Sequence, residues 1–116
     1  MASVFINKKA DLTSDGTTTL YTVPSATTAI IKSILVSDDS GSGSGITITL
    51  TNTSGAVFSI AFQRDIAPDV VAGPVEILTN PLVAEAGEIV KVAATNANRL
   101  HVILSAMEVT PRNVTT

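Results

Sequence analysis

The feature that most constrains the fold is a strict alternation of apolar and hydroxyl side chains in the middle of the chain. In residues 46–51, isoleucine or leucine occupies every second position and threonine the positions between. A period of two is typical of a β-strand with one face in a core and the other toward solvent. Because threonine is β-branched and suits a pleated surface, this segment predicts a half-buried strand.

Short segments of the same kind recur along the chain, separated by turn residues. Phe58, Ile60 and Phe62 repeat the period of two directly after a turn at 53–55, and they predict the second strand of a hairpin. Residues 27–37 predict a central strand that is apolar on both faces and buried between layers. Further strands are expected over residues 18–23, 75–78, 88–94 and 100–109. Apolar stripes at helical spacing are missing, and only residues 81–86 are expected to form a single helical turn.

Seven or eight short strands in 116 residues predict one all-β domain. The expected architecture is an antiparallel β-sandwich of the jelly-roll or Greek-key kind, spanning residues 13–110. Residues 1–12 are expected to form an N-terminal arm or an edge strand, and residues 111–116 a C-terminal tail. The Gly- and Ser-rich segment from Asp38 to Gly45 predicts a flexible loop. A terminal segment such as Val4 to Leu12 can complete the sheet of a neighbouring molecule by edge addition.

Composition excludes several kinds of partner. The net charge is −3 and the Lys and Arg residues are scattered, which argues against a nucleic-acid-binding surface. No apolar run approaches the roughly 20 residues needed to span a bilayer, and the N-terminus does not resemble a secretory signal, so neither a membrane nor secretion is expected. Charged residues make up only 15% of the chain, against about 25% in average soluble proteins. A surface with so few charged residues predicts that part of it is covered by other protein chains.

The sequence offers little material for catalysis or metal binding. Its single histidine, His101, lies in a predicted strand without a nucleophile motif, which favours a surface or interface residue over a catalytic triad. The chain has no cysteine, so Asp38, Asp39 and the loop after them are the sole candidate for an ion site. They lack the acid spacing of a calcium loop, and a solvated acidic turn is the preferred interpretation. We therefore predict a protein that is not an enzyme and needs no cofactor or metal.

Protein interfaces remain as the expected kind of functional site. The candidates are Val4, Phe5 and Ile6 in the N-terminal segment, Thr47, Thr49 and Thr51 on one strand face, and His101. Stiff threonine side chains present a surface that packs with little loss of entropy. An ordinary solvent-facing role for these threonines is the equally weighted alternative.

Two stretches resemble a known group of proteins. The first is Leu20-Tyr-Thr-Val-Pro-Ser, continuing to Thr28-Ala-Ile-Ile-Lys-Ser-Ile-Leu-Val-Ser. The second is Pro81-Leu-Val-Ala-Glu-Ala-Gly-Glu-Ile-Val-Lys-Val with Leu100-His-Val-Ile-Leu-Ser-Ala-Met-Glu-Val. Together they are similar to small virion structural proteins of tailed bacteriophages, and the resemblance extends over about two thirds of the chain. These motifs are strand and turn patterns without catalytic residues.

The resemblance implies a β-sandwich displayed on a virus particle that assembles in the host cytoplasm. The main hypothesis is a capsid decoration (cement) protein that binds the major capsid protein, or other virion proteins, and stabilises the assembled shell. A neck, tail or fibre-base component involved in host attachment is the alternative. Self-association, for example as a trimer, is also expected. Many symmetric copies of a cement protein add modest contacts into a large total.

Overall fold

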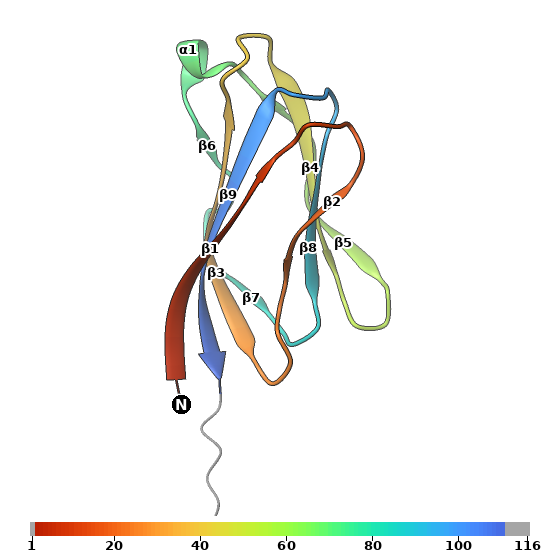
Figure 1. Ribbon diagram of the computed structural model, residues 1–116, viewed down its shortest axis with the longest axis vertical. Helices are drawn as coiled ribbons and strands as arrows, with labels where there is room; N and C mark the ends of the chain where they lie inside the picture. The colour runs from red at the N-terminus through yellow and green to blue at the C-terminus, as the bar shows by residue number, and fades with distance from the viewer. Residues whose placement is uncertain (1, 111–116) are drawn as a thin grey trace, which may run out of the picture.

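The structure, a computed structural model, describes residues 2–110 and folds them into two β-sheets packed face to face (Figure 1). The predicted all-β sandwich is thereby confirmed, whereas the predicted tail at 111–116 lies outside the described residues. In chain order the elements are β1 (Ala2–Asp11), β2 (Thr18–Thr22), β3 (Thr28–Asp38), β4 (Ser44–Thr51), β5 (Val57–Ile66), α1 (Asp69–Ala72), β6 (Val75–Glu76), β7 (Leu82–Ala84), β8 (Ile89–Ala94) and β9 (Leu100–Thr110). Within this part of the chain, no helix has the length and apolar character that crossing a membrane requires.

In both sheets, strands that are neighbours in space are mostly far apart along the chain. Sheet one runs β1-β9-β3-β6, with β7 also paired to β3, and sheet two runs β2-β8-β4-β5. All strand pairs are antiparallel. Of the two predicted topologies, this order is that of a jelly roll, provided that β6 and β7 are counted as one interrupted strand.

That interruption explains why nine strands are found in residues 2–110 where seven or eight were expected. Both β6 and β7 pair with β3, at its later and earlier residues respectively. Opposite the gap, the Glu76 carboxylate accepts a hydrogen bond from the backbone N–H of Ile34 (2.9 Å) and another from the Ser33 hydroxyl. A side chain therefore satisfies β3 where its neighbouring strand is broken.

The one helical turn lies at a different place from the one predicted. Residues 82–84, expected to form a helical turn, are the strand β7, because pairing with residues 29–31 of β3 satisfies their backbone groups. The single turn of helix in the described chain is instead α1, which follows Pro68. Proline cannot donate to a sheet ladder, so the chain leaves the sheet after β5, and the N–H groups of Val71 and Ala72 bond to the Pro68 carbonyl.

Strand β3 is central in its sheet, as predicted, but the expectation that it is buried on both faces is wrong. Ala29, Ile31, Ile34 and Val36 point into the sandwich and are 0% exposed. A register shift between Ile31 and Ser33 inserts an extra residue, so Ile31 and Ile34, three apart, share the inner face. The outer face of β3 is only half-covered.

The core between the sheets is aliphatic except for Tyr21. Its largest fully buried side chains are leucine, isoleucine and valine, contributed by both sheets and by Leu12 in the β1–β2 connection. All three phenylalanines lie outside it: Phe5 is 75%, Phe58 57% and Phe62 70% exposed. The jelly roll thus fills its interior without its phenylalanines.

Candidate interaction surfaces

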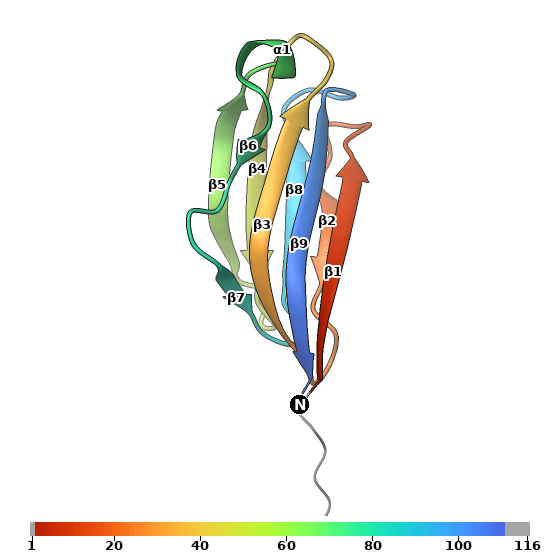
Figure 2. The ribbon, with the colours of Figure 1, turned by 90° about the vertical axis from the view of Figure 1, so that its left-hand side faces the viewer.

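The two long outermost strands lie on opposite sides of the sandwich. Strand β1 is the last strand of sheet one and β5 the last strand of sheet two. Figure 2 shows β1 at one lateral margin of the molecule and β5 at the other. Each has a hydrogen-bonded neighbour on one side only, so its other side is open to a partner.

The N-terminal segment is an edge strand of its own sandwich. Strand β1 pairs with β9 over ten residues without a register shift, so it does not extend away as an arm. Val4 and Phe5 are 55% and 75% exposed, whereas the side chain of Ile6 is half-buried against the core. Of the three interface candidates here, Val4 and Phe5 are available to a partner, and we name these two residues the β1 edge.

A second apolar surface, which the sequence analysis missed, lies on β5. Val57, Phe58 and Phe62 are all more than half exposed. The predicted hairpin is confirmed by the antiparallel pairing of β4 with β5, but Phe58 and Phe62, which the period of two places on one face, are not buried in it. Two register shifts against β4 break the period of two, and β5 has no second neighbour to cover it. We name Val57, Phe58 and Phe62 the β5 edge.

An apolar row also crosses the outer face of sheet one. Phe5 lies opposite Met107 on β9, Met107 opposite Ile30 on β3, and Ile30 opposite Val83 on β7. Directly opposite residues in an antiparallel sheet share a face, so the four side chains form one continuous row. The row joins the β1 edge to the side of the sandwich where β7 lies.

The predicted threonine face exists, but two of its three hydroxyls are unavailable. Thr47, Thr49 and Thr51 point to the outer face of sheet two. The Thr47 hydroxyl accepts a hydrogen bond from the backbone N–H of Gln63 (3.0 Å). Thr51 is only 9% exposed, and its Oγ1 has no hydrogen-bond partner among the described residues. Thr49 therefore offers the one free hydroxyl of this set.

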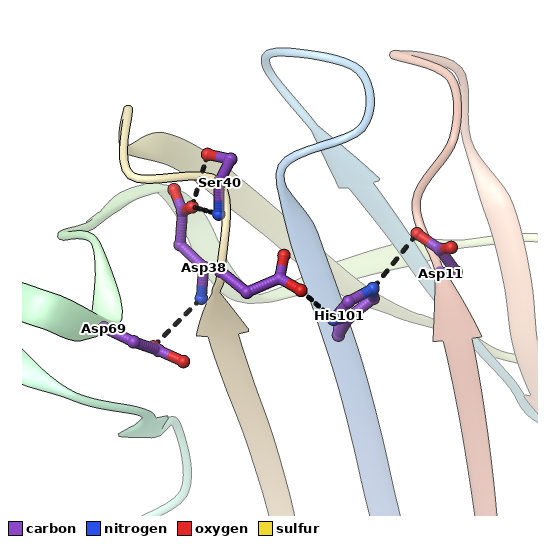
Figure 3. Close-up of polar contacts among 6 residues, drawn as sticks. Asp11, Asp38, Ser40, Asp69 and His101 are labelled. Carbon is purple, nitrogen blue, oxygen red and sulfur yellow. Dashed lines mark hydrogen bonds and ion pairs between the residues drawn. The ribbon is translucent and has the colours of Figure 1, made fainter.

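His101 lies on the outer face of sheet one between two carboxylates (Figure 3). Its Nε2 is 3.3 Å from Oδ1 of Asp11, and its Nδ1 is 3.7 Å from Oδ2 of Asp39. Within residues 2–110 no hydroxyl group hydrogen-bonds the imidazole, although Ser37 lines the same shallow depression of about 330 Å³. Two carboxylates thus flank the ring, and among these residues no hydroxyl is placed as the nucleophile that a triad requires.

The two carboxylates of the acidic loop, those of Asp38 and Asp39, do not converge on a common ion site. Asp38 is 0% exposed, and its Oδ1 accepts hydrogen bonds from the N–H (2.8 Å) and hydroxyl (2.6 Å) of Ser40 (Figure 3). The carboxylate of the neighbouring Asp39 instead lies 3.7 Å from Nδ1 of His101. Across residues 2–110 no group of three or more His, Cys, Asp or Glu side chains is suited to a metal ion. The Asp38 side chain thus caps the start of the loop.

A second depression, of about 420 Å³, lies at the same end of the sandwich. Its polar groups bond to one another: the Thr95 hydroxyl accepts from the N–H of Gly45 (2.8 Å), and Oγ of Ser44 lies 3.1 Å from it. Arg99 fixes the neighbouring loop by donating to the Gly43 carbonyl (2.8 Å). The hydroxyls here hold strand β4 to the 95–99 connection.

Comparisons with known proteins found distant structural likenesses only. No family model matches the chain, and no curated protein matches it. Among solved structures, one similar chain is a pentameric capsid protein isolated from metagenomic phage sequences, with 18% identity, a TM-score of 0.44 and coverage of 91% of this chain. A second structure of the same description has 17% identity, a TM-score of 0.44 and coverage of 89%. The present chain spans 60% of the length of each.

Proposed function

We propose that this chain is a non-enzymatic structural protein of a bacteriophage particle and works by packing against other protein chains. The observation that carries the proposal is that all three phenylalanines are exposed at the edges of a sandwich whose interior is already filled. Burying one phenylalanine is worth about 2 kcal/mol, so leaving them in water forgoes stability that a partner surface would supply.

The sequence resemblance to small virion proteins of tailed phages supplies the biological setting. It rests on the segments that form β2, β3, β7, β8 and β9, of which β3 and β9 are central in sheet one and β8 is central in sheet two. Because the resemblance lies in the scaffold, the proposed setting and the exposed edges are independent grounds for the same role.

Within this setting we propose the more specific role of a capsid decoration protein. Such a protein needs a small rigid body with apolar contact points and little charge to desolvate at each contact. A chain with 15% charged residues and a 10-residue unbroken edge strand meets these requirements. Many symmetric copies then convert modest contacts into a stable shell.

The test uses phage particles assembled with and without this chain. If the chain is a cement protein, particles lacking it lose their genome at lower temperature, and added purified protein restores the wild-type value. Unchanged heat resistance contradicts cementing. Immunogold labelling locates the chain: label over the head supports capsid decoration, label at the neck or tail supports the alternative of an attachment component, and unlabelled particles contradict a virion role.

A further inference from the structure

The outer face of sheet one, which is turned toward the viewer in Figure 2, carries a second apolar row beside the row already described. Ile103 on β9 lies opposite Leu35 on β3 and, on its other side, opposite Lys9 on β1. Ile103 is 41% exposed, Leu35 is partly exposed, and neither belongs to the core between the sheets. The positions between the two rows hold small polar side chains, those of Asn7, Ser105 and Ser33. Two apolar rows separated by small polar groups therefore run across this face.

The two strand carboxylates on the same face are already engaged within the molecule. Oδ1 of Asp11 lies 3.3 Å from Nε2 of His101. The Glu76 carboxylate accepts hydrogen bonds from the N–H groups of Ile34 (2.9 Å) and Leu78 (3.2 Å). Both carboxylates on this face therefore have partners of their own.

Two lysines supply the unengaged charge of this face. Lys32 is the extra residue at the register shift in β3, and its side chain is exposed. Because sheet two covers the inner face of this central strand, an exposed side chain here lies on the outer face. Lys9, also exposed, stands at the β1 end of the second apolar row. Neither lysine forms a salt bridge with a residue of the described chain, 2–110.

We infer that the outer face of sheet one docks an acidic, partly apolar segment of another virion protein. Carboxylates of that segment pair with Lys9 and Lys32, and its apolar side chains cover the two rows. The inference rests on the proposed packing role and adds to it a face and a partner chemistry. Opposite charges beside an apolar contact steer the encounter and fix its register.

The same charges disfavour other occupants of this face. A second copy that applied its own outer face would bring lysines toward lysines, with no unengaged strand carboxylate to meet them. Nucleic acid and anionic lipid headgroups are bound by clustered cations that neutralise successive phosphates. Two lysines set among apolar side chains, in a chain of net charge −3, do not form such a cluster.

The outer face of sheet two provides the matched control. Lys91 on β8 lies opposite Thr19 on β2 and Thr49 on β4, so a lysine occupies a strand face here too, between hydroxyl side chains. Like the other two lysines, it forms no salt bridge within residues 2–110. A substitution of Lys91 therefore changes the net charge by the same amount without touching the proposed docking face.

Cosedimentation of the purified chain with phage particles that lack it tests the inference. We expect Lys9→Glu and Lys32→Glu in one chain to weaken binding by about tenfold at low salt, because each lost ion pair is replaced by repulsion. The corresponding double arginine variant keeps both charges and should bind like the wild type. Lys91→Glu should stay within about twofold of the wild type. Circular dichroism checks that each variant is folded.

Each result decides the inference. Wild-type binding of the folded double glutamate variant overturns the inference and leaves the proposed function standing. A wild-type chain that does not bind particles overturns the proposed function together with the inference. Equal losses in the arginine and glutamate variants would show that carboxylates are not the partner groups. Oligomers in sedimentation velocity, or binding to phosphatidylglycerol vesicles, would also overturn the inference if the two glutamates abolished them, because the occupant would then be a second copy or a membrane.

Amine labelling gives a second measurement that needs no substitution. We expect a small amine-reactive ester to modify Lys9 and Lys32 at least tenfold more slowly on particles than in the free chain, as measured by mass spectrometry. Lys91 should keep the rate that it has in the free chain. Protection of Lys91 with unchanged labelling of Lys9 and Lys32 would place the contact on sheet two and overturn the inference.

Discussion

The phenol of Tyr21 donates a 2.5 Å hydrogen bond to the carboxylate of Glu108, and this bond joins the two sheets. Tyr21 lies on β2 in sheet two and is 3% exposed, while Glu108 lies on β9 in sheet one. Burial, followed by the hydrogen bond and the negative charge of Glu108, raises the pKa of Tyr21 well above its ordinary value of 10.0. This polar contact thus joins two sheets whose hydrophobic core is otherwise aliphatic.

The raised pKa predicts how stability changes at alkaline pH. Because the pKa of Tyr21 is higher in the folded chain than in the unfolded one, its contribution to stability is complete below pH 10.0 and is lost as the pH rises through the folded pKa. Tyr21 is the one tyrosine and the chain has no tryptophan, so tyrosinate absorbance reports this residue alone. We expect no tyrosinate in the native protein at the pH where free tyrosine ionises.

Glu108→Gln is the matched variant for this titration. It removes the negative charge but leaves the burial of Tyr21, so the phenol should ionise at a lower pH than in the wild type and still above 10.0. Ionisation of native wild-type Tyr21 at the ordinary value, with circular dichroism unchanged, would show that the phenol is not held as described.

Glu76 replaces a missing strand neighbour, and its removal should weaken the fold. Glu76→Ala leaves the N–H of Ile34 without its carboxylate partner, and we expect the free energy of unfolding to fall by about 1–2 kcal/mol, a value limited by the exposure of Glu76. Glu76→Gln retains an acceptor oxygen and should lose less. Urea denaturation of the two variants checks the order, and equal losses would contradict the hydrogen-bonding explanation.

Two threonines on one strand provide opposite predictions for the same substitution. Thr51→Val replaces a buried hydroxyl that has no partner among the described residues, so we expect unchanged or increased stability, by up to about 1 kcal/mol. Thr47→Val removes the acceptor for the N–H of Gln63 and should cost about 1 kcal/mol. Thermal unfolding of both variants measures the difference, and loss of stability in Thr51→Val would mean that its hydroxyl is satisfied.

Period-two alternation was sufficient to predict the sandwich, because it reports which face of a strand is buried. The alternation at 46–51 placed Ile46 and Ile48 in the core, where both are 0% exposed. The pattern fails where a strand carries an extra residue. The register shift near Lys32 moved Ile34 onto the face of Ile31, and the two shifts in β5 left Phe58 and Phe62 in solvent. A bulge depends on the partner strand, which a local pattern does not contain.

The candidate surfaces could be predicted from the sequence less completely than the fold, because contacts between residues far apart in the chain shape them. Phe5 was a candidate because its segment was expected to form an arm or edge strand, and it is 75% exposed on the edge strand β1. The hydroxyl partner of Thr47 is the backbone of Gln63, 16 residues away, and the interruption between β6 and β7 is stabilised by Glu76, 42 residues from Ile34. Such contacts follow from the paired strands and have no sequence motif.

The exposed phenylalanines give the prediction that separates stability from function. Phe58→Ser and Phe62→Ser change side chains that contact mainly water, so each should alter the free energy of unfolding by no more than about 0.5 kcal/mol. Ile48→Ala, in the core at 0% exposure, should cost about 3 kcal/mol and serves as the control for loss of packing. If the β5 edge is a contact surface, the serine variants should lose particle binding or self-association while remaining as heat-resistant as the wild type. A serine variant that unfolds as readily as Ile48→Ala would instead mean that the phenylalanines stabilise the sandwich itself, and the observation that carries the proposed function would no longer hold.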